Sequence, residues 1–236
     1  YQGGLKIGLT SETRFGENVL WKTQLAYAGD RLEIFPMSND RETPGRENLD
    51  LGTYTVNDSY YTDDNRHRAQ LQTSASYFLD NLFGDHELKA GIDAQLTWNT
   101  TYEDRSGGLI YYDRGTTQQS STLSGAGDPY QVAVYGEPLE KFVWGNAIGL
   151  YVQDVWRPFK NLTIRPGVRF DSSRAYNDPS DGGAEIFNFN HPSPRIGAAW
   201  DPFSDGKTVI RGGYYQYAEV GMLMLPGFVG RGLQND

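Results

Sequence analysis

The stretch that decides the fold is HELKAGIDAQLTWNTTY, residues 86–102, in which two kinds of side chain alternate. Even-numbered positions carry mostly apolar and aromatic side chains, such as Leu88, Ile92 and Trp98, whereas odd-numbered positions carry polar or small ones, such as Asp93. A period of two predicts an extended strand with two chemically different faces. The run is longer than the roughly 9 to 11 residues that a tilted strand needs to cross a bilayer. It fits a strand with one face toward lipid, or a long half-buried strand of a large soluble sheet.

The composition excludes several classes of protein. The chain has 236 residues, no cysteine, a net charge of −9 and a mean hydropathy of −0.60. Without cysteine there is no disulfide, thiolate metal site or cysteine nucleophile, and the acidic balance argues against a nucleic-acid partner. The low hydropathy still allows a transmembrane barrel, whose strands are apolar only at alternate positions and whose loops are polar. Because the chain starts at Tyr1 and ends in a loop-like tail, we expect an internal fragment.

Short and long connections alternate along the chain. Short turns are predicted near 15–18, 79–85, 158–161 and 201–206, and long polar loops at 29–65, 103–129, 172–192 and from 218 onward. This order predicts an all-β fold of about eight antiparallel transmembrane strands, with short turns on the periplasmic side and long loops outside. Pro166 lies inside the predicted strand 162–171 and predicts a bulge or a local break, because proline cannot donate to the ladder.

Three segments resemble a known family. GLYVQDVWRPFKNLTIRPGVRFD (149–171), SPRIGAAWDPFSDGKTVIRGGYYQYAE (193–219) and YFLDNLFGDHELKAGID (77–93) are similar to barrel hairpins of TonB-dependent outer-membrane transporters, particularly the Oar-like group. That group carries a carboxypeptidase-regulatory-like domain before its plug. The resemblance implies a bacterial outer-membrane location and a 22-stranded barrel closed by an N-terminal plug. Residues 1–236 would then be one incomplete barrel domain, with the plug outside the chain.

The function that this resemblance implies is uptake of a large or scarce ligand: an oligosaccharide, a peptide or a metal chelate. We expect no enzyme activity and no cofactor. The expected partners are outer-membrane lipid, the protein's own plug, the TonB complex through that plug, and a surface ligand or protein. Three alternatives stay open, namely a structural or adhesive surface barrel, a self-contained eight-stranded barrel, and a soluble carbohydrate-binding or hydrolytic β-domain.

Two groups of side chains are candidate site residues. Aromatic pairs in the expected loops would form stacking platforms for a ligand, unless they belong to the interfacial girdle or pack within the loops. They are Tyr60, Tyr61, Tyr111, Tyr112, Phe187 and Phe189. Charged side chains at inward positions of the strands would face the lumen, where the arginines could pair with Asp171, Asp201 or plug carboxylates. The lumen-facing set is Arg165, Arg169, Asp171, Arg195 and Arg211.

The sequence does not predict a metal or catalytic site. Acidic loop residues supply oxygen ligands of the type that Ca²⁺ needs, but their spacing does not match an EF-hand, so solvated loop acids are the favoured interpretation. They are Asp58, Asp63, Asp64, Asp178 and Asp181. The three histidines, His67, His86 and His191, have no neighbouring ligand motif, and no nucleophile elbow is present.

Overall fold

Almost all of the regular structure is β-strand. The computed structural model describes residues 1–115 and 127–218. Two short 3-10 turns occur there, η1 (Ser106–Gly108) and η2 (Pro179–Asp181). The strands are β1 (Gln2–Phe15), β2 (Val19–Ile34), β3 (Gly45–Asn48), β4 (Thr53–Thr55), β5 (Tyr60–Leu79), β6 (Asp85–Arg105), β7 (Leu109–Arg114), β8 (Asp128–Val134), β9 (Leu139–Phe159), β10 (Leu162–Tyr176), β11 (Glu185–Trp200) and β12 (Ile210–Tyr215). Over the described ranges, no helix combines the length and apolar character needed to cross a membrane.

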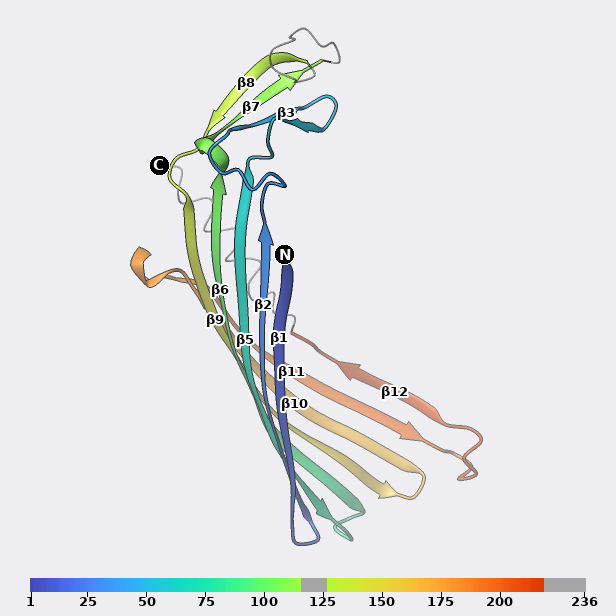
Figure 1. The fold of residues 1–236 in the computed structure, drawn as a ribbon. Coiled ribbons are helices and arrows are strands. Elements are labelled where there is room, and N and C mark those ends of the chain that lie inside the picture. Colours follow the sequence, from blue (N-terminus) through green and yellow to red (C-terminus); the bar gives the residue numbers. More distant parts are fainter. Residues whose placement is uncertain (116–126, 219–236) are drawn as a thin grey trace. The chain divides into compact units, whose positions relative to one another are not determined.

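The long strands form one sheet with an up-and-down order (Figure 1). Its order is β1-β2-β5-β6-β9-β10-β11-β12, and the remaining strands form a second sheet in the order β4-β3-β7-β8. Strand β10 pairs antiparallel with β9 on one side and with β11 on the other, and β11 pairs antiparallel with β12. This arrangement confirms the predicted antiparallel wall of about eight strands.

The chain divides into two compact units. The loop unit comprises Tyr1–Gly4, Gly29–Arg66 and Asn99–Phe142. The wall unit comprises Leu5–Ala28, His67–Trp98 and Val143–Asp236. The second, four-stranded sheet belongs to the loop unit, whereas the alternating apolar rows lie in the wall unit.

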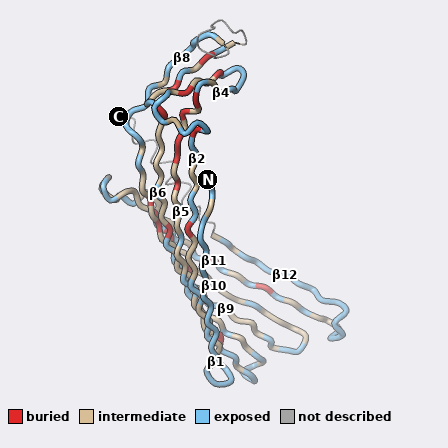
Figure 2. The backbone as a smooth tube through the Cα atoms, viewed as in Figure 1, coloured by how far each residue is buried: buried red, intermediate tan, exposed pale blue. Residues whose placement is uncertain are grey.

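The wall unit has the polarity of its two faces reversed relative to a soluble sheet. On β6, the apolar side chains of Leu88, Ile92 and Leu96 are 38%, 43% and 44% exposed, whereas Thr97 on the opposite face is 4% exposed. The buried residues of the wall unit include the small polar residues Ser76, Thr97, Ser173 and Ser193. Figure 2 colours buried positions red. A soluble protein buries its apolar rows, so an apolar face exposed over many strands is the reverse of a soluble sheet. The members of the apolar face include Leu5, Ile7, Leu9, Leu25, Leu71, Leu88, Ile92, Leu96, Ile148, Leu150, Val152, Val168, Phe170, Ile196 and Ile210.

The strands are longer than the sequence predicted, and the long loops are correspondingly shorter. The predicted loop 29–65 contains the end of β2, all of β3 and β4, and the start of β5. The predicted loop 103–129 contains the end of β6, all of β7 and the start of β8. The predicted loop 172–192 shrinks to residues 177–184, between β10 and β11. These loop predictions were wrong because the strands continue past the apolar rows. Once both faces of a strand are polar, the period of two disappears although the backbone stays paired. Of the loop expected from 218 onward, all but residue 218 lies outside the described residues.

The proline inside β10 does not interrupt the strand. Pro166 pairs with Ile196 of β11, and the register shift relative to β9 lies between Leu162 and Ile164. The pairing with β9 leaves no partner at Arg165 or Pro166. The predicted bulge is therefore present in the same strand, a few residues before the proline.

Candidate functional site

The second sheet places loop-unit side chains on two opposite faces. Strand β3 pairs parallel with β7, and β7 pairs antiparallel with β8. Cross-strand partners point to the same side, so Arg46 and Tyr111 share one face. Glu47 and Tyr112 share the other. Tyr111 and Tyr112, adjacent in sequence, therefore belong to different surfaces.

A buried ion pair holds the first face together. Arg46 and Asp113 form a two-pronged pair in which Arg46 Nη2 lies 2.7 Å from Asp113 Oδ1 and Arg46 Nε also donates to this carboxylate. Asp113 is only 1% exposed. The hydrogen bond to Asp113 raises the pKa of Arg46. Tyr111 lies against this pair, with the Arg46 Cζ 5.9 Å from its ring centroid. The pair therefore ties β3 to β7.

A tyrosine cluster surrounds a cation in the loop unit. The Arg105 Cζ lies 4.3 Å from the ring centroid of Tyr60 and 5.0 Å from that of Tyr135, within cation–π distance of both. Burial, followed by the neighbouring phenol of Tyr135, raises the pKa of Tyr112. The negative charge of Glu47 raises the pKa of Tyr54, which is 55% exposed. These six residues, Glu47, Tyr54, Tyr60, Arg105, Tyr112 and Tyr135, are called the Arg105 cluster.

The Arg105 cluster can bind a polar ligand in three ways. Its rings offer flat surfaces on which a sugar, a peptide side chain or an aromatic chelator can stack. Its phenols and the Glu47 carboxylate offer hydrogen-bond donors and acceptors, and Arg105 offers a positive charge. Sequence reasoning found Tyr60 and Tyr112 but missed the other four residues. No local pattern indicated them, because the parallel pairing of β3 with β7 joins segments far apart in the chain.

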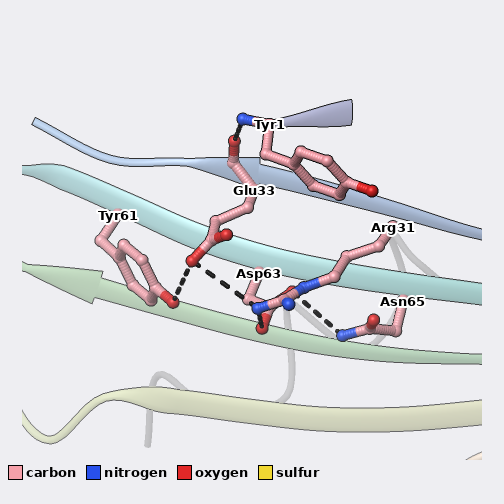
Figure 3. Close-up of polar contacts among 6 residues, drawn as sticks. All are labelled: Tyr1, Arg31, Glu33, Tyr61, Asp63 and Asn65. Carbon is pink, nitrogen blue, oxygen red and sulfur yellow. Dashed lines mark hydrogen bonds and ion pairs between the residues drawn. The ribbon is translucent and has the colours of Figure 1, made fainter. Parts of the chain in front are cut away.

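Tyr61 belongs to a different, closed network (Figure 3). It is 6% exposed and donates a hydrogen bond to Glu33 Oε1 at 3.3 Å. Arg31 donates to both carboxylate oxygens of Asp63 at 2.8 Å and lies 3.6 Å from Glu33. Arg41 stacks on the Tyr61 ring with its Cζ 3.5 Å from the centroid. Tyr61 is thus buried in a network that joins loop-unit strands, and its ring is not available to a ligand.

Phe187 and Phe189 lie in the wall unit rather than in a loop. Both are on β11, opposite Ala175 and Ser173 of β10. Their ring centroids are 6.4 Å apart, and Phe189 stacks in turn on His191 at 5.8 Å. Of the six aromatic candidates, Phe187 and Phe189 stack on each other, and Tyr60 and Tyr112 both belong to the Arg105 cluster.

Of the four inward arginines predicted in the wall unit, one forms ion pairs with described residues and three do not. Arg169 binds two carboxylates, Asp93 on β6 and Asp171 on its own strand, the latter with Nε 2.7 Å from Oδ1. Gly149 on β9 leaves the space for this arginine, since a Cβ there would collide with the guanidinium. Arg165, Arg195 and Arg211 occupy the same face of β10, β11 and β12 but form no ion pair among the described residues. Asp201 accepts from the backbone N–H of Gly206 instead.

Candidate metal ligands are engaged by protein donors. The Asp64 carboxylate accepts hydrogen bonds from the Arg66 guanidinium and the Thr101 hydroxyl. Asp58 accepts a hydrogen bond from the Tyr60 amide, and Asp178 accepts one from the Ser180 amide. Asp63 is held by Arg31 as described, and Asp181 is the last residue of η2. No group of three or more His, Asp or Glu side chains that could hold a metal ion occurs in the described ranges.

The three histidines lie apart from one another, each beside an aromatic ring. His67 shares a 2.8 Å hydrogen bond with the Tyr27 hydroxyl and stacks on Trp98. His86 contacts Asp154 at 2.6 Å and stacks on Trp156. Asp154 interrupts the apolar face of β9, and this histidine explains how a carboxylate is accommodated there.

Comparisons with known proteins agree with this architecture. Residues 2–221 match the family described as TonB dependent receptor-like, beta-barrel. The chain is 26% identical over 170 residues to the TonB-dependent transporter Oar of Myxococcus xanthus, a match that covers 68% of this chain and 16% of that protein. The chain thus spans about one sixth of the length of this relative.

Solved receptors share the fold at low sequence identity. The siderophore receptor PiuA of Acinetobacter baumannii has a TM-score of 0.58 at 13% identity, covering 91% of this chain and 32% of that one. The ferric citrate transporter FecA has a TM-score of 0.55 at 15% identity, and the match covers 97% of this chain and 29% of that one. FpvA of P. aeruginosa, in complex with a ferric pyoverdine, has a TM-score of 0.53 at 13% identity, and the match covers 83% of this chain and 24% of that one. Given the family match over nearly its whole length, the chain belongs to the TonB-dependent receptor β-barrel family, whose members are outer-membrane transporters and receptors and not enzymes.

Proposed function

We propose that this chain is part of the wall of a plugged outer-membrane barrel that takes up a large or scarce ligand. The Arg105 cluster is the observation that carries the proposal, because it gathers four tyrosines, an arginine and a glutamate in the loop unit. A ligand too large for a simple pore needs such a surface with several contact types, since each single contact contributes little.

The class of ligand stays open among an oligosaccharide, a peptide and a metal chelate. The names of the three solved receptors refer to iron chelates, but at 13% to 15% identity this likeness supports the fold alone. Stacking on tyrosine suits all three classes. Transport itself would need the plug and the TonB complex, which we assign to the full-length protein because the chain spans 16% of its transporter relative.

The test removes the two rings that flank Arg105 in the full-length protein. We expect Tyr60→Ala/Tyr135→Ala to weaken binding of the transported compound by about tenfold, from the loss of two cation–π and stacking contacts. Purified receptor would be screened by calorimetry with ferric citrate, a β-linked oligosaccharide and a peptide mixture. The matched control is Tyr111→Ala/Tyr130→Ala, which also removes two tyrosines that lie over arginines, Arg46 and Arg114. Equal binding by both double variants would exclude the Arg105 cluster as the site.

A structural or adhesive surface barrel is the second candidate. The ordered second sheet with its buried Arg46–Asp113 pair favours it, since a rigid surface suits a protein partner. The two functions separate in cells that lack TonB. Uptake that stops without TonB supports transport, whereas surface binding that persists with no TonB-dependent uptake supports adhesion.

A further inference from the structure

Almost all of the negative charge of the protein lies in the loop unit. The three segments of this unit contain 15 Asp and Glu residues against 7 Lys and Arg residues, a net charge of −8, whereas the whole chain carries −9. The wall unit is therefore nearly neutral. A surface with this charge attracts cations and repels anions during their approach, and added salt weakens both effects.

The arginines of the loop unit are already engaged by other side chains of the protein. Three form ion pairs with aspartates, and three lie over tyrosine rings. In sequence order they are Arg31, Arg41, Arg46, Arg66, Arg105 and Arg114. The charge that this unit presents to an approaching ligand is therefore mainly that of its excess carboxylates.

The acids of the loop unit are dispersed rather than grouped. Over the described ranges, no three His, Asp or Glu side chains come together in a way that could hold a metal ion. A hard cation such as Ca²⁺ needs about six to eight oxygen ligands around one point. Dispersed carboxylates suit a ligand whose positive charges are spaced along a chain, and a peptide with several lysines or arginines has this form.

Glu47 lies between two tyrosines on one face of the second sheet. Strand β3 is between β4 and β7, and Glu47 pairs in register with Tyr54 of β4 and with Tyr112 of β7. Neighbouring strands are about 4.8 Å apart, so the two tyrosine positions are separated by roughly 10 Å. A cation held midway, above Glu47, would lie about 5 Å from each ring, within the roughly 6 Å reach of a cation–π contact.

The site is open to solvent at Tyr54, where the local charge is negative. Tyr54 is 55% exposed. The charge of Glu47, burial and the charge of Asp58, in this order, raise the pKa of the Tyr54 phenol. Asp58 is next to the Arg105 cluster, because it accepts a 3.1 Å hydrogen bond from the Tyr60 amide. A cation that enters beside Tyr54 therefore meets an aromatic ring and two carboxylates.

We propose that Tyr54, Glu47 and Tyr112 bind a lysine or arginine side chain, and that the ligand captured by the loop unit is a basic peptide. The inference rests on the proposed function, because these three residues belong to the Arg105 cluster and the inference names the ligand of that cluster. A neutral oligosaccharide would use the rings but not the charge. An anionic chelate would be repelled by the excess carboxylates.

The first test compares two probes on the purified full-length receptor. A peptide of alternating lysine and glycine carries the proposed cations, and the same peptide with acetylated lysines lacks their charge. We expect calorimetry to show about tenfold tighter binding of the charged peptide, with an affinity that falls as salt is added. Equal binding of the two peptides, or no binding of either, would overturn the inference without the need for any variant.

The second test locates the site with conservative variants. We expect Glu47→Gln to weaken binding of the lysine peptide about fivefold, because it removes a partly screened charge. The control Glu137→Gln removes the same charge from an exposed position between β8 and β9 and should leave the affinity nearly unchanged. Equal weakening by both variants would indicate a general attraction and reject the site.

A third pair of variants tests the ring itself. Tyr54→Phe should keep the affinity for the lysine peptide, whereas Tyr54→Leu should lower it, because only an aromatic ring attracts a cation. Similar affinities of the phenylalanine and leucine variants would exclude a cation–π contact at this position.

Uptake measurements separate this inference from the proposed function. TonB-dependent uptake of ferric citrate or of a β-linked oligosaccharide, with no binding of the lysine peptide, would overturn the inference and keep the proposed function. Conversely, binding of the lysine peptide through Glu47 in a protein without TonB-dependent uptake would support the site and reject the proposed function.

Discussion

At the residue scale, the loop unit contains ion pairs that differ in burial and therefore in energetic weight. Arg46 and Asp113 have side chains that are 12% and 1% exposed, whereas those of Arg31 and Asp63 are 46% and 20% exposed. Water and salt screen the Arg31–Asp63 pair, so it contributes little to the stability of the loop unit. Breaking the first pair would leave a charge buried without a partner, which is much more costly.

Replacing Asp113 should therefore loosen the second sheet far more than replacing Asp63. We expect Asp113→Ala to destabilise the loop unit by about 3 kcal/mol, because it leaves the charge of Arg46 buried without a partner. The control Asp63→Ala should cost less than about 1 kcal/mol. Hydrogen exchange of the β3 and β7 amides in the full-length protein measures both. Similar loss of protection in the two variants would show that burial does not decide the weight of these pairs.

A pH effect is expected at Asp40, in the segment between β2 and β3. The Thr43 side chain and the amides of Thr43 and Glu42 donate to its carboxylate and lower the pKa of Asp40. A lowered pKa means that the stabilisation is complete above the unfolded pKa and disappears as the pH falls through the folded pKa. The Glu42 and Thr43 amides should thus lose exchange protection below about pH 4. Asp40→Asn should remove this pH dependence; a variant with the same acid transition would assign it to another group.

At the scale of the element, the alternating sequence of β6 places neighbouring side chains in two different environments. Its apolar positions are exposed, and its polar positions are covered by neighbouring strands. Asp93 is bound by Arg169 from β10, so a substitution there would disturb an ion pair as well as the face. Gln95, whose side chain accepts a 3.1 Å hydrogen bond from Gln70, reports on the inward face with less disturbance.

A charge on the outward face of β6 should impair assembly. We expect Ile92→Arg to cost roughly 2 to 4 kcal/mol, because arginine at the middle of the lipid face loses its hydration. Gln95→Arg should be tolerated, since it faces a polar interior. Heat-modifiable migration of the full-length barrel on gels measures the assembled fraction. If Gln95→Arg were as harmful as Ile92→Arg, the assignment of faces would be reversed or absent.

At the scale of the whole molecule, the prediction succeeded for the wall and failed for the loops. The eight-stranded antiparallel order followed from periodic faces and short turns, and the family followed from the resemblance of three segments to known barrel hairpins; both are confirmed. The predicted loop 172–192 was wrong by more than half its length, because β10 and β11 stay paired beyond their long apolar rows, where only Phe187 and Phe189 alternate with polar residues. Among the aromatic candidates, Phe187 and Phe189 stack because they lie two residues apart on β11, whereas Tyr61 is buried in a separate network.

The sequence by itself determined the two faces of the wall, because adjacent residues of a strand point to opposite sides whatever the rest of the chain does. That local rule is enough to separate outward-facing Ile92 from inward-facing Gln95. Only the tertiary structure decided which polar residues meet. The Arg46–Asp113 pair joins β3 to β7, and the Arg105 cluster draws its residues from β3, β4, β5, β6 and β7 and from Tyr135 after β8. Pairing partners are chosen by register between distant segments, which leaves no periodic signal in either segment alone.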